Sequence, residues 1–226
     1  DIDDLVKLLL EAGSDLGQRA HNGATLAHYA VMTHNAKSLR ALLKHAGSKL
    51  KIDQGTKLND ATSLGLAAYL SKPECVELLI AAKANVAHLN SMGASVLTNA
   101  AENPATTPEV LDLIFESNQL DVNYACRPRT RKWYLIERAF ELAYRRNLVH
   151  KTDLVMDVAH TRGSTALHYA ARHGHLQLVV WLLQHGAGES LRVRNKLGAT
   201  PMDMAHLFGP YPEVEALLGS AMVDPS

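Results

Sequence analysis

Short apolar blocks recur along the chain, and they are of two alternating kinds. One kind is rich in alanine and begins at a Thr or Ser, as in 165–171 (TALHYAA), whereas the other ends in a pair of large aliphatic residues, as in 176–183 (LQLVVWLL). Blocks of about ten residues are too short to be helical in isolation. Alanines would let neighbouring helices approach closely, and the aliphatic pairs would form a buried stripe. The pattern therefore predicts pairs of short helices that stack on neighbouring pairs.

The alanine-rich blocks define a repeat. Counted from the Thr or Ser that begins each block, the intervals are 37, 33, 70 and 35 residues. Because 70 is two periods, we expect one degenerate unit inside the third interval. The markers are Thr25, Thr62, Ser95, Thr165 and Thr200.

The clearest unit, 163–187, resembles the ankyrin repeat. That repeat is a β-turn followed by two antiparallel helices, about 33 residues long, with a Thr-Pro-Leu-His-x-Ala core. The residues in register with it are Thr165, Leu167, His168, Ala170, Gly174, His175, Val179, Val180, Leu182, Leu183, Gly186 and Ala187.

The resemblance covers nearly the whole chain. It implies an all-α solenoid of helix-turn-helix units joined by β-hairpin-like loops. It also implies that the imidazoles of His28 and His168 hydrogen-bond neighbouring backbone. Further copies of the first block stand at 23–30, 60–67, 93–100 and 198–205.

We expect a single ankyrin-repeat domain over residues 1–226. The segment 4–13 matches the second helix of a repeat, so the chain begins within a unit, and we expect a boundary within a longer chain there. The expected divisions are a half repeat at 1–17, six repeats at approximately 18–53, 54–87, 88–123, 124–157, 158–191 and 192–219, and a tail at 220–226.

The fourth of these units departs from the template. Its loop, 121–133, is longer than the others, and Lys132 and Glu137 replace the usual Gly and His. We expect a first helix at about 134–146, with Ala139 in the alanine position. A second helix is expected near 148–156, without the usual aliphatic pair.

Net charge bears on the class of partner. The chain has 23 basic and 23 acidic residues, and this zero balance argues against nucleic-acid binding by bulk electrostatics. The charges are unevenly distributed along the chain. Residues 127–151 hold eight basic and two acidic residues (+6), whereas 73–121 hold seven acidic residues and one basic residue (−6). A localised acidic partner therefore remains compatible with the sequence.

Other features of the composition bear on location. The longest notable apolar run, 179–183, is too short to span a membrane. Cys75 and Cys126 lie far apart, without a CxxC pairing, which indicates a reducing compartment. We expect a cytoplasmic or nuclear protein.

In ankyrin proteins the partner usually contacts the hairpin tips and the exposed face of the first helices. The fifth and eighth positions from each marker should face that groove, and several hold residue types common at binding hot spots. The alternative is that the tyrosines merely fill gaps between repeats, and Leu66 and Leu207 are left unassigned. The expected groove residues are Tyr29, Met32, Tyr69, Asn99, Glu102, Arg138, Glu141, Tyr169, Arg172 and Met204.

The loop of the fourth unit adds a basic finger with a tryptophan beside it. Such a cluster suits an acidic peptide, a phosphorylated segment or another anionic group. The alternative is a solvated surface that the preceding acidic unit partly neutralises. The finger residues are Arg127, Arg129, Arg131, Lys132 and Trp133.

The sequence shows no catalytic or metal-binding pattern. His173 and His175 resemble a ligand pair, but a Gly-His dipeptide marks the turn between helices in the ankyrin pattern. There is no zinc-spaced Cys/His set, no HExxH motif, no P-loop and no Gly-x-Gly-x-x-Gly motif. We therefore expect no enzyme activity, no metal and no cofactor.

These features predict a protein-protein interaction module. It would bind a partner protein or peptide in its groove and at its hairpin tips, and an acidic segment is the candidate for the finger. The half repeat leaves a second possibility open, a regulatory cytosolic domain of a larger enzyme or ion channel that contacts other domains of its own chain. The repeat does not identify the partner, because its surface residues vary freely.

Overall fold

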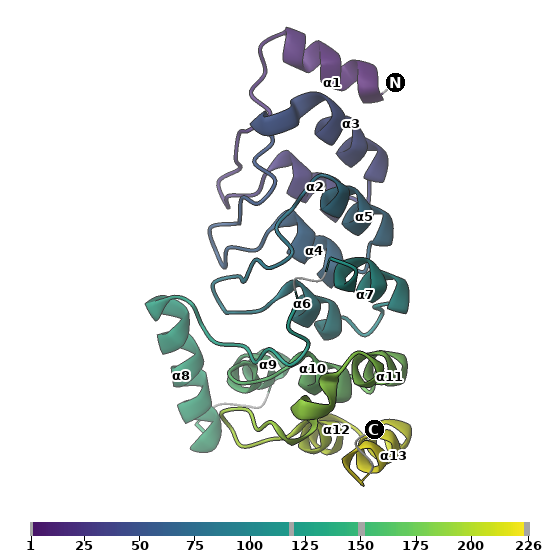
Figure 1. Ribbon diagram of the computed structural model, residues 1–226. Coiled ribbons are helices and arrows are strands. Elements are labelled where there is room, and N and C mark those ends of the chain that lie inside the picture. Colours follow the sequence, from purple (N-terminus) through teal and green to yellow (C-terminus); the bar gives the residue numbers. More distant parts are fainter. Residues whose placement is uncertain (1, 118–119, 149–151, 224–226) are drawn as a thin grey trace.

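The structure is a computed structural model that describes residues 2–117, 120–148 and 152–223 (Figure 1). Its helices stack in pairs into an elongated solenoid, and no β-strand occurs in these three ranges. This confirms the expected all-α solenoid. The helices are α1 (Ile2–Glu11), α2 (Leu26–Met32), α3 (Ala36–Ala46), α4 (Ser63–Tyr69), α5 (Pro73–Ala81), α6 (Val96–Glu102), α7 (Pro108–Phe115), α8 (Arg131–Arg145), α9 (Asp153–Thr161), α10 (Ala166–Arg172), α11 (Leu176–Gln184), α12 (Pro201–Phe208) and α13 (Pro212–Val223), with 3-10 turns η1 (Gly47–Lys49) and η2 (Ala187–Arg192).

The Thr or Ser marker of each repeat fixes the start of the first helix that follows it. The backbone N–H of Thr165 donates to Nδ1 of His168 at 3.1 Å, and that of Ser95 donates to Oγ1 of Thr98 at 2.8 Å. These capping boxes satisfy N–H groups that a helix start leaves unpaired. The histidine also reaches the next unit, because its Nε2 lies 3.1 Å from the carbonyl oxygen of Ala199. His28 contacts Ala61 in the same way, at 2.9 Å.

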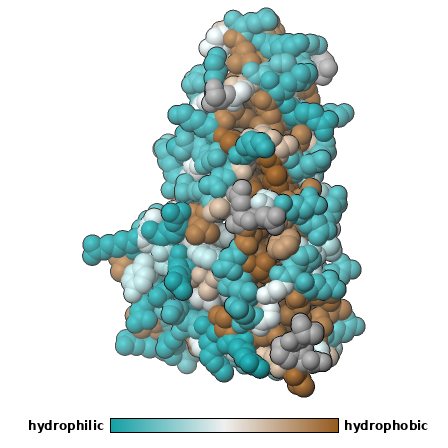
Figure 2. All heavy atoms as spheres, in the orientation of Figure 1, coloured by the Kyte–Doolittle hydropathy of each residue, from teal (hydrophilic) through white to brown (hydrophobic). Residues whose placement is uncertain are grey.

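Two layers of helices form the stack. The first helices follow one another in the order α2, α4, α6, α10 and α12, and the second helices in the order α3, α5, α7, α11 and α13. Alanines lie between the first helices, and large aliphatic residues fill the space behind them. Burying each such aliphatic side chain contributes about 1.5–3 kcal/mol. Figure 2 shows hydrophobic residues along the length of the stack, bordered by hydrophilic ones. The fully buried residues include Ala67, Ala100, Ala170, Ala205, Leu39, Leu79, Ile114, Leu182 and Leu218.

The unit expected at 124–157 is not a repeat of the stack. Helix α6 packs directly on α10, and α8 packs on α9 beside the stack, on the side of the hairpin loops (Figure 1). In the second layer, Nε1 of Trp181 on α11 donates to Oδ1 of Asp112 on α7 at 2.7 Å. The prediction that 124–157 forms a repeat between its two neighbours in the stack is therefore wrong.

Residues 127–162, which we call the insertion, extend from the tip of a hairpin. The N–H of Cys126 donates to the carbonyl of Ser164 at 2.9 Å, and that of Gly163 donates to the carbonyl of Cys126 at 2.8 Å. Asn90, Gly93 and Ala94 form the same pair of hydrogen bonds in the preceding hairpin, at 3.1 and 2.9 Å. The chain thus leaves a regular hairpin at Cys126 and re-enters it at Gly163.

Both ends of the insertion join the hydrogen bonds that link successive hairpins. At its start, Arg129 N–H donates to the carbonyl of Ser91 at 3.0 Å, and at its end Lys196 N–H donates to the carbonyl of Arg162 at 2.9 Å. The hairpin tip at Gly93, where φ is +82°, lies against the backbone of Arg127, so that a Cβ there would collide with it. The insertion is anchored at both ends without interrupting the hairpin side of the solenoid.

The helices of the insertion begin where threonines cap them, and the expected ranges 134–146 and 148–156 are wrong. Oγ1 of Thr130 accepts from the N–H of Trp133 at 3.3 Å, which starts α8 three residues early. Thr152 caps α9 in the same way. Ala139 is exposed, because the inner face of α8 carries Glu137 and Glu141 instead.

Replacing His168 with alanine should lower the free energy of unfolding by about 2 kcal/mol. The ring is fully buried, and its loss leaves the Thr165 N–H and the Ala199 carbonyl without their partner. Urea titration at pH 7 measures the change, and burial lowers the pKa of His168 to about 4, so the wild-type ring is neutral there. Tyr29→Ala, at a side chain that is 42% exposed, is the control. Equal costs for the two variants would contradict the bridging role.

Candidate functional site

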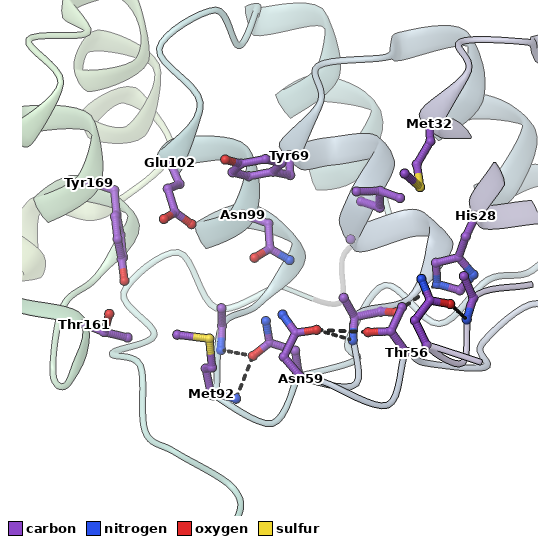
Figure 3. A pocket seen from close by; sticks show the side chains of 17 residues that line it. His28, Met32, Thr56, Asn59, Tyr69, Met92, Asn99, Glu102, Thr161 and Tyr169 are labelled. Carbon is purple, nitrogen blue, oxygen red and sulfur yellow. Dashed lines mark hydrogen bonds between the residues drawn. The ribbon is translucent and has the colours of Figure 1, made fainter. Parts of the chain in front are cut away.

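The first helices and the hairpin loops line one side of the solenoid, which holds a pocket in its N-terminal half. This groove pocket has a volume of about 420 Å³ and is lined by α2, α4, α6 and their hairpins, with Thr161 and Tyr169 at one end. In Figure 3, one row of side chains comes from the first helices, and the other comes mainly from the loops. The first row holds Met32, Tyr69, Glu102 and Tyr169, and the second holds Thr56, Asn59 and Met92 of the loops and Thr161 at the end of α9.

The groove residues expected on α2, α4 and α6 lie on or beside this pocket. Tyr29, Met32 and Tyr69 are 42%, 53% and 43% exposed. Asn99 and Glu102 are half-buried and line the pocket. The tyrosines of α2 and α4 are therefore partly exposed, and their part in binding stays a prediction.

The insertion covers the corresponding positions in the C-terminal half. Tyr169 is 7% exposed, and burial raises the pKa of its hydroxyl, an increase that Cys126 reinforces and Thr161 of α9 opposes. Met204 is 2% exposed, with its Sδ 3.9 Å from Nδ2 of Asn195. The expectation that these two residues face an open groove is wrong, since they pack against the insertion and its neighbouring hairpin.

Arg172, also expected in the groove, is 7% exposed and lies with its guanidinium carbon 4.4 Å from the ring centroid of Phe208. Its charge acts on Glu102, the acidic residue among those that line the pocket. Burial raises the pKa of Glu102, and Arg172 opposes that rise. Burial also lowers the pKa of His28, on the pocket wall, so the pocket carries little fixed positive charge of its own.

A buried carboxylate pair lies beneath α8. Glu141, expected in the groove, is fully buried and accepts from Nη1 of Arg162 at 3.0 Å and of Arg138 at 3.3 Å. Glu137 is fully buried as well, and within the described part of the chain neither of its carboxylate oxygens has a hydrogen-bond partner. The polar contacts of Glu141 therefore join α8 to the end of the insertion itself, at Arg162.

The basic finger contains both anchored and exposed residues. Nη1 of Arg129 donates to the carbonyl of Leu89 at 3.0 Å, and Nε1 of Trp133 donates to the carbonyl of Leu58 at 3.2 Å. These two side chains hold the insertion against the earlier hairpins. Arg129 is nevertheless exposed, as are the finger residues without such an anchor, Arg127, Arg131 and Lys132.

Two family models match the chain. One, described as ankyrin repeats (3 copies), matches residues 1–90, and the other, described as ankyrin repeats (many copies), matches residues 149–205. This chain is an ankyrin repeat protein. Ankyrin repeats are generally protein-protein interaction modules and typically non-catalytic. The interval between the two matched ranges contains α6, α7 and α8.

His175 and Cys126 of this ankyrin protein have structural surroundings that account for them. Nε2 of His175 lies 2.8 Å from the carbonyl oxygen of Thr106, which links α11 to the preceding unit, and Gly174 adopts φ +64° at the turn. Burial raises the pKa of the Cys126 thiol to about 12, which disfavours the nucleophilic thiolate. The described residues contain no group of three His, Cys, Asp or Glu side chains placed to hold a metal, and no helix among them could span a membrane.

Sequence reasoning missed the loop side of the pocket. Asn59, Asn90 and Met92 line it from the hairpins, and Thr161 reaches it from the end of the insertion. An asparagine before the hairpin turn recurs along the chain, at Asn22, Asn59 and Asn90, and that recurrence was a usable signal. Thr161 had no such signal, because its position depends on how the insertion folds back.

Proposed function

We propose that this ankyrin domain binds a peptide or an extended protein segment in the groove pocket. The observation that supports this best is the exposure of Met32 and Tyr69 on consecutive first helices, at the edge of a pocket that the insertion closes at one end. Large side chains of this type contribute strongly to protein interfaces. The closed end gives a bound segment a defined register, because the segment meets Tyr169 and Thr161 there.

We further propose that an acidic stretch of the same partner contacts the exposed finger residues. Arg127 lies against the hairpin tip at Gly93, and Met92 of that tip lines the pocket. A segment that leaves the closed end of the pocket therefore passes close to the exposed arginine. The segment 73–121 holds seven of the 23 acidic residues and one basic residue, whereas 127–151, which includes the finger, holds eight basic and two acidic residues.

The double variant Met32→Ala/Tyr69→Ala should bind peptides selected against the intact chain at least tenfold more weakly, which corresponds to about 1.4 kcal/mol or more. Peptides selected from a random display library serve as probes, and fluorescence anisotropy gives the affinities. The melting temperature should stay within about 2 °C, because both side chains are exposed.

Leu58→Ala is the matched control, since Leu58 is 67% exposed and does not line the pocket. It should leave peptide affinity unchanged. Selected peptides that bind the double variant as tightly as the intact chain would exclude the groove pocket as the binding site.

A further inference from the structure

Helix α8 carries an exposed stripe in which arginine and leucine alternate. Arg131, Leu135, Arg138, Leu142 and Arg145 follow one another at intervals of four, three, four and three residues along its whole length. Leu135 is 55% exposed and Leu142 38%, and the three arginines are exposed. This spacing is that of the seam along which two helices pack lengthwise.

The stripe lies along an exposed flank of α8, and at its end Arg145 reaches the carbonyl of Lys196 in the hairpin before α12. The inner side carries the buried Glu137 and Glu141, and the described element against which α8 packs is α9. Arg162 packs over the ring of Tyr134 at 4.8 Å, at the border between the two sides. In Figure 2 the region that α8 occupies in Figure 1 shows hydrophobic residues among hydrophilic ones.

We propose that this stripe docks an acidic amphipathic helix of a partner protein. Leucine or isoleucine side chains of that helix would pack on Leu135 and Leu142, and glutamates or aspartates between them would pair with the arginines. Charge favours this occupant, because 127–151 carries a balance of +6 and the acidic residues of α8 point inward. Arg138 keeps half of its side chain exposed although it also bonds Glu141, and Arg145 donates to the carbonyl of Lys196, so both are held in place.

The alternation distinguishes a partner helix from a lipid surface. A helix that lies in a membrane interface separates its apolar face from its basic face, so that the apolar side chains enter the acyl region together. In α8, an arginine precedes and follows each leucine of the stripe, and burying the leucines in lipid would bury the arginines too. A helix with acidic residues at matching positions pairs with those arginines instead.

The proposal deepens the proposed contact between the finger and an acidic segment, and it is independent of the groove pocket. A fluorescent 18-residue peptide in which Leu and Glu alternate at four- and three-residue intervals serves as the probe, with a peptide of the same composition in scrambled order beside it. We expect the intact chain to bind the first peptide at least tenfold more tightly than the scrambled one in anisotropy titrations.

The variant Leu135→Ala/Leu142→Ala should weaken binding of the first peptide at least tenfold. Its matched control is Leu5→Ala/Leu8→Ala, which removes two leucines on α1 that are 55% and 62% exposed. Arg131→Glu should also weaken binding, and a peptide with Lys in place of the facing Glu should recover it. Because Arg131 is exposed at the start of α8, a glutamate there suits the helix dipole.

Three results would overturn the docking proposal. They are equal affinity for the ordered and scrambled peptides, equal weakening by the α1 control, and tighter binding to phosphatidylserine vesicles that depends on Leu135 and Leu142. If the groove variant Met32→Ala/Tyr69→Ala loses its selected peptides while the α8 variants change nothing, the proposed function stands and the stripe does not take part in it.

Discussion

Replacing residues 127–162 with the dipeptide Ser-Met should give a protein that still unfolds cooperatively. The dipeptide reproduces the preceding hairpin, in which Ser91 and Met92 join Asn90 to Gly93. Cys126 and Gly163 occupy the same hydrogen-bonded positions, so the shortened hairpin can close with the same geometry. Because α6 already packs on α10, no new interface has to form.

The insertion nevertheless stabilises the stack through the residues that it covers. We expect the free energy of unfolding to fall by about 3 kcal/mol, because Tyr169 regains contact with water and the buried Asn195 side chain loses its partner His160. The helical signal in circular dichroism should fall in proportion to the helical residues that are removed, which are the 15 residues of α8 and the 9 residues of α9. Urea titration followed by the fluorescence of Trp181, the tryptophan that remains of two, reports the stack itself.

The outcome separates an insertion from a repeat. In a solenoid each repeat is stabilised by the repeats on either side. Deletion of an internal repeat therefore forces the two flanking repeats to pack on each other, although they are not in contact in the intact protein. If the shortened chain lacks a cooperative transition, α8 and α9 are part of the stack. A matched control exchanges Ser91 and Met92 for Gly-Ser in the intact chain, which tests the tolerance of a hairpin tip to a changed sequence.

The regular part of the fold was predictable because local signals and packing agree in it. Thr25, Ser95, Thr165 and Thr200 cap their helices through bonds to the residue three positions later, and that residue is visible in the sequence. Glycines stand just after two of the second-layer helices, and they adopt the positive φ that favours glycine at a helix end, +79° at Gly13 and +93° at Gly186. Such features depend on neighbours in the sequence and in the next repeat, so the period reveals them.

The insertion was mistaken for a repeat because its length equals the period. Residues 127–162 span about one repeat, and the interval from Ser95 to Thr165 therefore reads as two units. The contrary signals were chemical: Glu137 stands where a repeat has histidine, and the second helix lacks its aliphatic pair. The burial of Tyr169 could not be predicted, because it depends on where the insertion folds back.

Glu137 gives the insertion a dependence on pH. It is fully buried beside Glu141 and Arg162, and burial raises its pKa to about 7, an increase that Arg162 opposes and Glu141 reinforces. In the unfolded chain the carboxyl has its ordinary value of 4.5. Between these values the folded protein holds a proton that the unfolded chain releases. The contribution of Glu137 to stability is therefore fully present below pH 4.5 and is lost as the pH rises through 7.

Glu137→Gln should remove this dependence, because glutamine resembles the protonated acid and does not ionise. We expect the variant and the wild type to have similar free energies of unfolding at pH 4, and the variant to be more stable by about 2–3 kcal/mol at pH 8. The measurement is a set of urea titrations from pH 4 to 8. Glu109→Gln, at an exposed position on α7, is the control and should show a constant difference from the wild type.

Comparing Glu137→Gln with the wild type at each pH separates the effect of the Glu137 carboxyl on stability from the effect of the histidines. Burial lowers the pKa of His160, His168 and His173 to about 4, so these rings stabilise the fold above pH 6.5 and lose that contribution as the pH falls toward 4. Their effect is common to both proteins and cancels in the difference. A difference between Glu137→Gln and wild type that stays constant from pH 4 to 8 would show that the pKa of Glu137 is the same in the folded and unfolded protein, with Arg162 offsetting the cost of its burial.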